Sequence, residues 1–273
     1  MVTIVYLVAG LSSRFGGKIK QFAVIGPNNE TLIELSMLQA KKAGFEKIVF
    51  VVGEKTKEPF KKKFGNNFQG TPIFYAEQEF DKEKRDKPWG TTDALVSAKN
   101  VVRENFVVCN GDDLYGTDAL KKAKTFLENC VDGEGIAIGY ELGKVIPEKG
   151  KANRGLFEFD ENYNITNIQE LLGIEKNNLN LKGLNEKTLV SMNLFGLNKN
   201  CLKLLDEKLA IFKKQNFSER QNECFLPVEI SNLIKEKKIR MKLIASNSRW
   251  FGVTNPEDEE IIKAKIKKIH KIV

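Results

Sequence analysis

The sequence has 273 residues, a formal net charge of +8 at pH 7, 41% hydrophobic and 29% charged residues. This composition is typical of a globular protein and excludes a disordered or fibrous chain. The single histidine, His270, argues against a catalytic triad or a multi-histidine metal site. The four cysteines are widely spaced without a CxxC pair, so no zinc knuckle or disulfide framework is expected.

The same features predict a cytoplasmic protein with small-molecule partners. The N-terminal apolar run ends at Gly10 and has no basic segment before it, which favours a buried strand over a signal peptide. No apolar stretch approaches the ~18 residues of a membrane span. The lysine runs lack interleaved aromatic residues and are interpreted as solvated helix faces, so neither a nucleic acid nor a membrane is an expected partner.

Strands and helices are expected to alternate over the first half of the chain. Residues 3–9 form a strand, residues 10–30 a long loop, and Thr31 with Glu34 forms a capping box that starts a helix ending at Gly44. Further strands are expected at 48–52, 72–76, 106–109 and 135–140, and helices at 56–64, 91–102 and 117–129. This alternation predicts an α/β fold with a doubly wound, mostly parallel, Rossmann-like sheet.

The second half has a different pattern. Residues 155–197 are expected to form a β-rich, substrate-binding insertion with an exposed loop at 174–187. Helices at 199–215 and 226–237, a strand at 239–245 and a terminal helix from Pro256 complete the prediction. Because no repeat and no linker rich in Pro, Gly or Ser is present, residues 1–273 are interpreted as one domain.

A glycine-rich segment follows the first strand. Ala9 and Gly10 lead into Arg14, two further glycines and Lys20. Backbone N–H groups of such a loop can cradle phosphate oxygens, and the two cations add the charge that a triphosphate requires. The spacing is neither GxGxxG nor GxxxxGK[ST], and an ordinary glycine loop with solvated cations is an equal alternative.

Two aspartates follow another strand, in the sequence Asn110-Gly-Asp112-Asp113. Mg²⁺ prefers carboxylate oxygens and takes waters and substrate phosphates as its other ligands. A simple Asn-Gly turn is the alternative. Ligands of parallel sheets bind beyond the carboxyl ends of the strands, so this turn and the loop at 10–20 are expected to line one crevice.

A third motif lies between them. Gln78 carries a donor and an acceptor that can read the edge of a base, and Gly90 lets the backbone approach a flat ligand. Trp89 is either a lid or a packing anchor, and packing is favoured.

In this order the motifs resemble those of the sugar-1-phosphate nucleotidyltransferases, with a uridylyltransferase- or thymidylyltransferase-like character. The segment from Trp250 to Asp258 resembles the closing motif of that family, and Leu226-Pro227 and Ser191-Met-Asn193 resemble a uridylyltransferase-like subgroup. The resemblance implies that residues 1–140 bind the nucleotide and that residues 141–273 bind the sugar phosphate and end in a helix.

The resemblance also implies roles for individual residues. Arg14 and Lys20 would be catalytic and hold the triphosphate, and Asp112 would bind Mg²⁺ at the reacting phosphate. Nucleotide-binding residues would be Ala9, Gly10, Gln78, Gly90 and Thr91. Glu170 and Asn193 would bind the sugar phosphate. The implied reaction is attack by the acceptor phosphate on the α-phosphorus of an NTP, which needs no general base because the nucleophile is already anionic.

The chain departs from the family pattern at two places. Gly252 stands where a second metal-binding aspartate is usual, so Asp113 is predicted as the second metal ligand, while Glu257 and Asp258 are interpreted as first-turn residues of a helix. Leu171 stands where a lysine usually follows the acid matched by Glu170. Lys176 or Lys182 is the candidate replacement.

The expected function is therefore an Mg²⁺-dependent transferase that joins an NTP, with UTP or dTTP favoured, to a sugar 1-phosphate and releases pyrophosphate. A cytidylyltransferase acting on a phosphorylated alcohol or choline is the alternative enzyme. A nucleotide-sensing homologue with weak catalysis is the alternative of another class, supported by Gly252. A dehydrogenase lacks its glycine fingerprint. The prediction allows a homo-oligomer.

Overall fold

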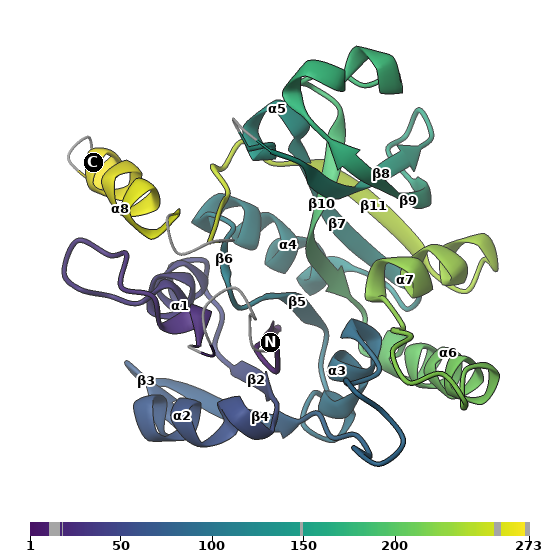
Figure 1. Cartoon of the computed structure of the whole chain (residues 1–273), viewed down its shortest axis with the longest axis horizontal. Coiled ribbons are helices and arrows are strands. Elements are labelled where there is room, and N and C mark those ends of the chain that lie inside the picture. Colours follow the sequence, from purple (N-terminus) through teal and green to yellow (C-terminus); the bar gives the residue numbers. More distant parts are fainter. Residues whose placement is uncertain (11–16, 18, 148–149, 254–257, 271–273) are drawn as a thin grey trace.

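A ten-stranded mixed sheet forms the centre of the described structure (Figure 1). The structure is a computed structural model that describes residues 1–10, 17, 19–147, 150–253 and 258–270. One half of the sheet is parallel, because β1 pairs in parallel with both β2 and β5, and β2 pairs in parallel with β4. These strands are β1 (Thr3–Leu7), β2 (Ile48–Val52), β4 (Thr71–Glu77) and β5 (Phe106–Asn110).

The other half of the sheet is built around an antiparallel strand. β10 (Leu189–Leu197) lies between β5 and β7 (Glu134–Glu141) and runs against both. β11 (Arg240–Ala245) adds to β7 in parallel. The hairpin of β8 (Ala152–Phe159) and β9 (Ile165–Ile174) branches from β10. The predicted α/β class with a mostly parallel sheet is confirmed, and the β-rich segment lies where it was expected.

Helices cover both faces of the sheet, and the alternation of strand side chains explains why. Ile4 and Tyr6 of β1 belong to one buried cluster, whereas Val5 belongs to the other. The first face is covered by α1 (Leu32–Lys42), α2 (Glu54–Phe64) and α4 (Thr117–Asn129). The second is covered by α3 (Thr91–Ser97), α6 (Cys201–Gln215) and α7 (Leu226–Lys235). Strand residues that are apolar on both faces are typical of a sheet buried between two layers of helices.

Several short elements were not predicted. α3 ends at Ser97 and continues as a 3₁₀ turn over Ala98–Asn100, so the expected helix over 91–102 is shorter than predicted. The unpredicted elements are β3 (Asn67–Phe68), β6 (Asp113–Leu114), β12 (Phe251–Gly252), α5 (Leu142–Val145) and 3₁₀ turns at Lys20–Phe22, Lys176–Asn178 and Asn180–Lys182.

The last helix, α8 (Asp258–His270), lies beside α1 (Figure 1). Ile262 and Ile266 of α8 join Leu32 and Leu35 of α1 in a third apolar cluster, which also includes Leu114 of β6. This cluster holds the C-terminal helix against the part of the chain that follows β5. None of the described helices has the length and apolar character needed to cross a membrane.

Candidate active site

The carboxyl ends of β1, β2, β4 and β5 meet at one edge of the sheet. The N–H of Gly111 donates to the carbonyl of Leu7 at 3.1 Å, so the turn after β5 lies directly against the end of β1. The N–H of Gln78 donates to the carbonyl of Val52 at 2.8 Å, which joins the ends of β4 and β2 in the same way. The three motifs from the sequence therefore start from one edge, as parallel pairing requires.

Lys20 and Asp112 are joined across the predicted crevice. The Nζ of Lys20 lies 2.7 Å from Oδ2 of Asp112, and both side chains are partly accessible, at 13% and 30%. The expected proximity of the loop at 10–20 and the turn at 110–113 is thus confirmed for this pair. Ala9 and Gly10 are described and lie at the end of β1, whereas Arg14 lies outside the described residues.

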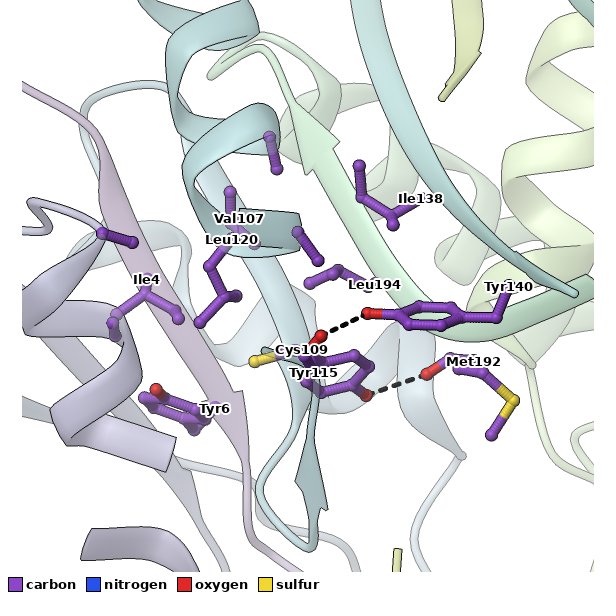
Figure 2. Close-up of a cluster of buried hydrophobic side chains, with 14 of the residues drawn as sticks. Ile4, Tyr6, Val107, Cys109, Tyr115, Leu120, Ile138, Tyr140, Met192 and Leu194 are labelled. Atoms are coloured by element: carbon purple, nitrogen blue, oxygen red, sulfur yellow. Dashed lines mark hydrogen bonds between the residues drawn. The ribbon is translucent and has the colours of Figure 1, made fainter. Parts of the chain in front are cut away.

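Asp113 is buried next to this pair. Its Oδ2 accepts a hydrogen bond from Nδ2 of Asn110 at 3.0 Å and lies 3.1 Å from the hydroxyl of Tyr115. That hydroxyl also donates to the carbonyl of Met192 on β10, and the hydroxyl of Tyr140 donates to the carbonyl of Tyr115 (Figure 2). Burial and the neighbouring charge of Asp112 raise the pKa of Asp113 to about 7.

Gly252 lies opposite Asp113. The two residues are partners in the antiparallel pair of β6 and β12. A Cβ at Gly252 would overlap the ring of Trp250 and would lie 2.6 Å from Oδ1 of Asp113. The ring of Trp250 and the carboxylate of Asp113 therefore together occupy the space that a side chain at position 252 would need, which the sequence could not show.

The donor set at this turn fits Mg²⁺ only with help from a substrate. Asp112 and Asp113 supply carboxylates, but the described residues contain no group of three or more His, Cys, Asp or Glu side chains placed to hold a metal. Mg²⁺ commonly binds through one or two carboxylates and completes its octahedron with waters and substrate phosphates. Two adjacent carboxylates match that mode of binding and do not match an all-protein metal cage.

Gln78 is buried, and its amide is oriented by two acceptors. Its Nε2 donates to the carbonyl of Gly90 at 3.0 Å and to Oδ2 of Asp93 at 2.8 Å. The other carboxylate oxygen of Asp93 pairs with Nζ of Lys213 on α6 at 2.5 Å. Because the amide nitrogen is already bound to two acceptors, the oxygen of Gln78 is the atom left for a ligand. The sequence pattern did not identify Asp93 or Lys213.

Gly90 belongs to a joint between two segments that are far apart in the sequence and pack against each other. We define this joint as residues 85–92 together with 219–226. The guanidinium of Arg85 donates to the carbonyls of Glu219 and Asn222, and its Cζ stacks 3.4 Å from the ring centroid of Trp89. Gly90 has a φ of +96°, and a Cβ there would lie 2.7 Å from the carbonyl oxygen of Cys224. Trp89 is thus a packing residue, as favoured, and Gly90 is required by its backbone conformation and by close approach.

Asn193 and Thr91 lie together near the turn. Both line a small cavity with Leu7, Val108, Asn110, Leu226 and Pro227. Asn193 has a φ of +60° at an irregularity in the register of β10, a conformation that few side chains other than Asn adopt readily. Glu170, by contrast, is exposed on β9 opposite Gly155, and no contact among the described residues joins it to this cavity. A larger open hollow of about 580 Å³ along α4 contains none of the predicted site residues.

The protein therefore has an α/β fold with polar side chains gathered at the carboxyl ends of its parallel strands, where such sheets bind their ligands. The family model of the nucleotidyl transferases matches residues 17–258, and the chain belongs to that family. A "Bifunctional protein GlmU" from Methanocaldococcus jannaschii is 28% identical over 170 residues, which cover 62% of this chain and 33% of the relative. The chain therefore spans about a third of the length of that relative.

Two solved structures share the fold over nearly the whole chain. The inositol-1-phosphate CTP transferase from T. maritima has a TM-score of 0.66 at 19% identity and covers 98% of this chain and 97% of its own. A putative glucose-1-phosphate thymidylyltransferase from Bacillus anthracis has a TM-score of 0.70 at 14% identity and covers 97% and 95%. The match of the family model confirms the predicted family and enzyme class, and the two structures confirm the fold.

Proposed function

We propose that this nucleotidyltransferase joins an NTP, with UTP or dTTP preferred, to a sugar 1-phosphate and releases pyrophosphate with the help of Mg²⁺. The observation that carries the proposal is the Lys20–Asp112 pair at the strand ends. It brings one cation for phosphate oxygens and one carboxylate for a metal ion to a single point.

The preference for UTP or dTTP rests on the orientation of Gln78. Its amide oxygen is an acceptor that fits the N3–H donor of uracil and thymine, whereas N3 of cytosine has no hydrogen and cytosine could meet this oxygen only through its 4-amino group. The thymidylyltransferase from Bacillus anthracis is consistent with this preference. The CTP transferase from T. maritima supports the alternative, a cytidylyltransferase acting on a phosphorylated alcohol or choline.

In the proposed reaction an oxygen of the acceptor phosphate attacks the α-phosphorus of the NTP, and the bond to the β-phosphate oxygen breaks. When bound, Mg²⁺ would neutralise charge on the phosphates and order them. Lys20 binds phosphate oxygens after it leaves Asp112, and the backbone after β1 faces the nucleotide. The nucleophile is anionic, so positioning and charge neutralisation supply the rate enhancement without a histidine.

A nucleotide-sensing protein without turnover is the second candidate. Gly252 favours it, because the carboxylate usual at that position in the resembling family is absent here. The buried Asp113 opposite Gly252 favours the enzyme, because a carboxylate occupies the same space.

A pyrophosphate-release screen tests the proposal. Each of UTP, dTTP, CTP, ATP and GTP is paired with glucose 1-phosphate, N-acetylglucosamine 1-phosphate, inositol 1-phosphate or phosphocholine, with Mg²⁺ or with EDTA. Metal-dependent release with UTP or dTTP and a sugar 1-phosphate is expected. Turnover confined to CTP with inositol 1-phosphate or phosphocholine would establish the cytidylyltransferase. NTP binding without turnover would establish the sensor.

A further inference from the structure

Arg154 on β8 is a half-buried cation without an acidic partner. Its guanidinium donates to the carbonyl of Val145 at 2.7 Å and to that of Asn153 at 2.9 Å. Its Nε is buried and has no hydrogen-bond acceptor, and no carboxylate forms an ion pair with Arg154 among the described residues. A guanidinium that is withdrawn from water normally has an anion beside it, because an unpaired buried charge is costly.

Trp250 places this cation beside the acidic turn. The Cζ of Arg154 lies 5.6 Å from the ring centroid of Trp250. The ring of Trp250 in turn fills the position that a Cβ on Gly252 would take, and Oδ1 of Asp113 lies 2.6 Å from that position. Burial lowers the pKa of Arg154, and the negative charge of Asp113 acts in the opposite direction. The indole Nε1 of Trp250 is a second buried donor without an acceptor. Two unused donors therefore belong to two side chains in contact.

The register of β8 and β9 places Arg154 opposite a position that matters in the family pattern. Arg154 is the antiparallel partner of Leu171 on β9. Directly opposed residues point to the same face of a sheet with Cβ atoms about 5 Å apart. Leu171 is the position at which the resemblance implies a lysine for the sugar phosphate. The cation missing from β9 is thus available from the neighbouring strand at the same place on the hairpin.

Lys176 and Lys182, the candidate replacements for the lysine of the family pattern, lie on the adjacent loop in less suitable positions. Lys182 is exposed, and its Nζ donates to the carbonyl of Leu172 at 3.2 Å. Lys176 is also exposed. Neither lysine combines burial with an unused donor near the acidic turn.

We propose that Arg154, together with the indole N–H of Trp250, binds the phosphate of the acceptor substrate. This inference rests on the proposed function, in which the acceptor is a phosphate monoester. The guanidinium retains the Nε hydrogen and one further hydrogen on each terminal nitrogen, which match the oxygens of a phosphate in a bidentate contact. Because Arg154 lies over the ring of Trp250, and that ring and the carboxylate of Asp113 both border Gly252, the phosphate would lie near the turn at which the nucleotide phosphates would meet the metal.

The test measures phosphate binding apart from turnover. The chain has two tryptophans, so a Trp89→Phe background leaves Trp250 as the only source of tryptophan emission. Inorganic phosphate and glucose 1-phosphate are titrated separately, and emission from Trp250 is recorded. We expect a saturable change in this background. Added Arg154→Met should weaken phosphate binding by about tenfold or more, and Arg154→Lys should keep part of the affinity.

Matched titrations separate a binding role from a structural one. Calorimetric binding of UTP with Mg²⁺ should change less than twofold in Arg154→Met, and Lys182→Met should titrate with phosphate like the parent. Thermal melting shows whether each variant is folded, and Arg154→Lys keeps the test valid where Arg154→Met melts early.

The proposal is overturned if phosphate causes no saturable change in the parent, if Arg154→Met binds phosphate normally, or if Lys182→Met is the variant that loses binding. Equal losses for phosphate and UTP would assign Arg154 a structural role. Arg154-dependent phosphate binding without any turnover would uphold this inference while the proposed function fails. Normal turnover and KM in Arg154→Met would overturn this inference and leave the proposed function standing.

Discussion

The carboxylate of Asp93 holds the amide of Gln78 in one orientation through a hydrogen bond of 2.8 Å to Nε2. Asp93 is itself buried and is fixed by Lys213, which reaches it from α6. A carboxylate accepts and cannot donate, so it excludes the flipped orientation in which the amide oxygen of Gln78 would face Asp93. The atom that Gln78 offers to a base is therefore determined by the carbonyl of Gly90 together with Asp93, which lies fifteen positions away in the sequence.

Asp93→Asn tests this orientation. An asparagine amide can donate or accept, so only the carbonyl of Gly90 still fixes the orientation of the Gln78 amide, and the choice between bases weakens. We expect kcat/KM for the preferred NTP to fall roughly tenfold relative to the other NTPs. The control is Lys99→Met, which breaks the ion pair with Asp206 and leaves Gln78 untouched. An unchanged ranking of NTPs in Asp93→Asn would contradict the prediction.

Gln78→Ala should reduce discrimination more directly. If Gln78 binds the base, its removal leaves a base edge without its partner, at a cost of about 1–3 kcal/mol. Competition binding of all four ribonucleotides and dTTP should show the loss for one or two of them. A small and equal loss for every NTP would instead make Gln78 a structural residue that connects Gly90 and Asp93.

Asp112→Ala should remove most turnover while the fold survives. Asp112 is at a strand end and is partly exposed, so its loss leaves no cavity in the core. We expect kcat to fall roughly 100-fold or more, because charge on the reacting phosphates is no longer balanced. NTP affinity should fall less, since Lys20 and the loop amides remain. Asp118→Ala, which removes an exposed aspartate on α4, is the matched control. Near-normal kcat with Mg²⁺ would refute the role of Asp112.

The stability of the metal-free protein should depend on pH through Asp113. Its pKa of about 7 in the folded state lies above its ordinary value of 3.8. The folded state therefore binds this proton more tightly than the unfolded state, and rising pH lowers stability between about pH 4 and pH 7. Asp113→Asn removes that loss of stability. In EDTA, the melting temperature of the variant relative to the wild type should therefore rise between about pH 4 and pH 7 and stay constant above pH 7. A difference that stays constant with pH would show that Asp113 is ionised throughout.

A side chain at position 252 should be tolerated poorly because of Trp250 and Asp113, and shortening Asp113 should relieve part of the conflict. Gly252→Asp alone should destabilise the protein by roughly 1–3 kcal/mol, because its Cβ meets Trp250 and Asp113. Shortening Asp113 in the double variant Gly252→Asp with Asp113→Ala should recover part of this loss. Additive effects in a double-mutant cycle, measured by chemical denaturation, would show that the two positions do not compete.

The sequence predicted the elements whose signals are local. Continuous β-branched runs predicted β1, β2 and β5, and the backbone N–H of Thr31 does donate to Glu34 at 2.7 Å at the start of α1. The two-residue strands β6 and β12 were missed because pairing across the chain creates them. No local pattern distinguishes two such residues from a loop.

The candidate site shows the same division between residues with a local sequence signal and residues that depend on distant partners. Lys20 and Asp112 were predicted to meet, because both follow the ends of neighbouring parallel strands. The residues that orient the site were missed, since each acts on a partner far away in sequence: Lys213 acts on Asp93 120 positions earlier, and Arg85 reaches a carbonyl 137 positions later. Asp113 was proposed as a metal ligand, but its fit against Gly252 follows only from the strand register.

The position of β10 between β5 and β7 has a consequence for how the chain is synthesised. Both neighbours leave the ribosome before β10 does, and their facing edges cannot pair with it until it emerges. At ordinary elongation rates the interval between the synthesis of the end of β7 and that of the end of β10 lasts roughly 3–11 s, which is long compared with local folding. Unpaired strand edges attract other chains, so the nascent protein passes through a stage at which holdase chaperones would protect it. β10 thus joins the two halves of the sheet, and only the outer edge of β7 then still waits for a later strand, β11.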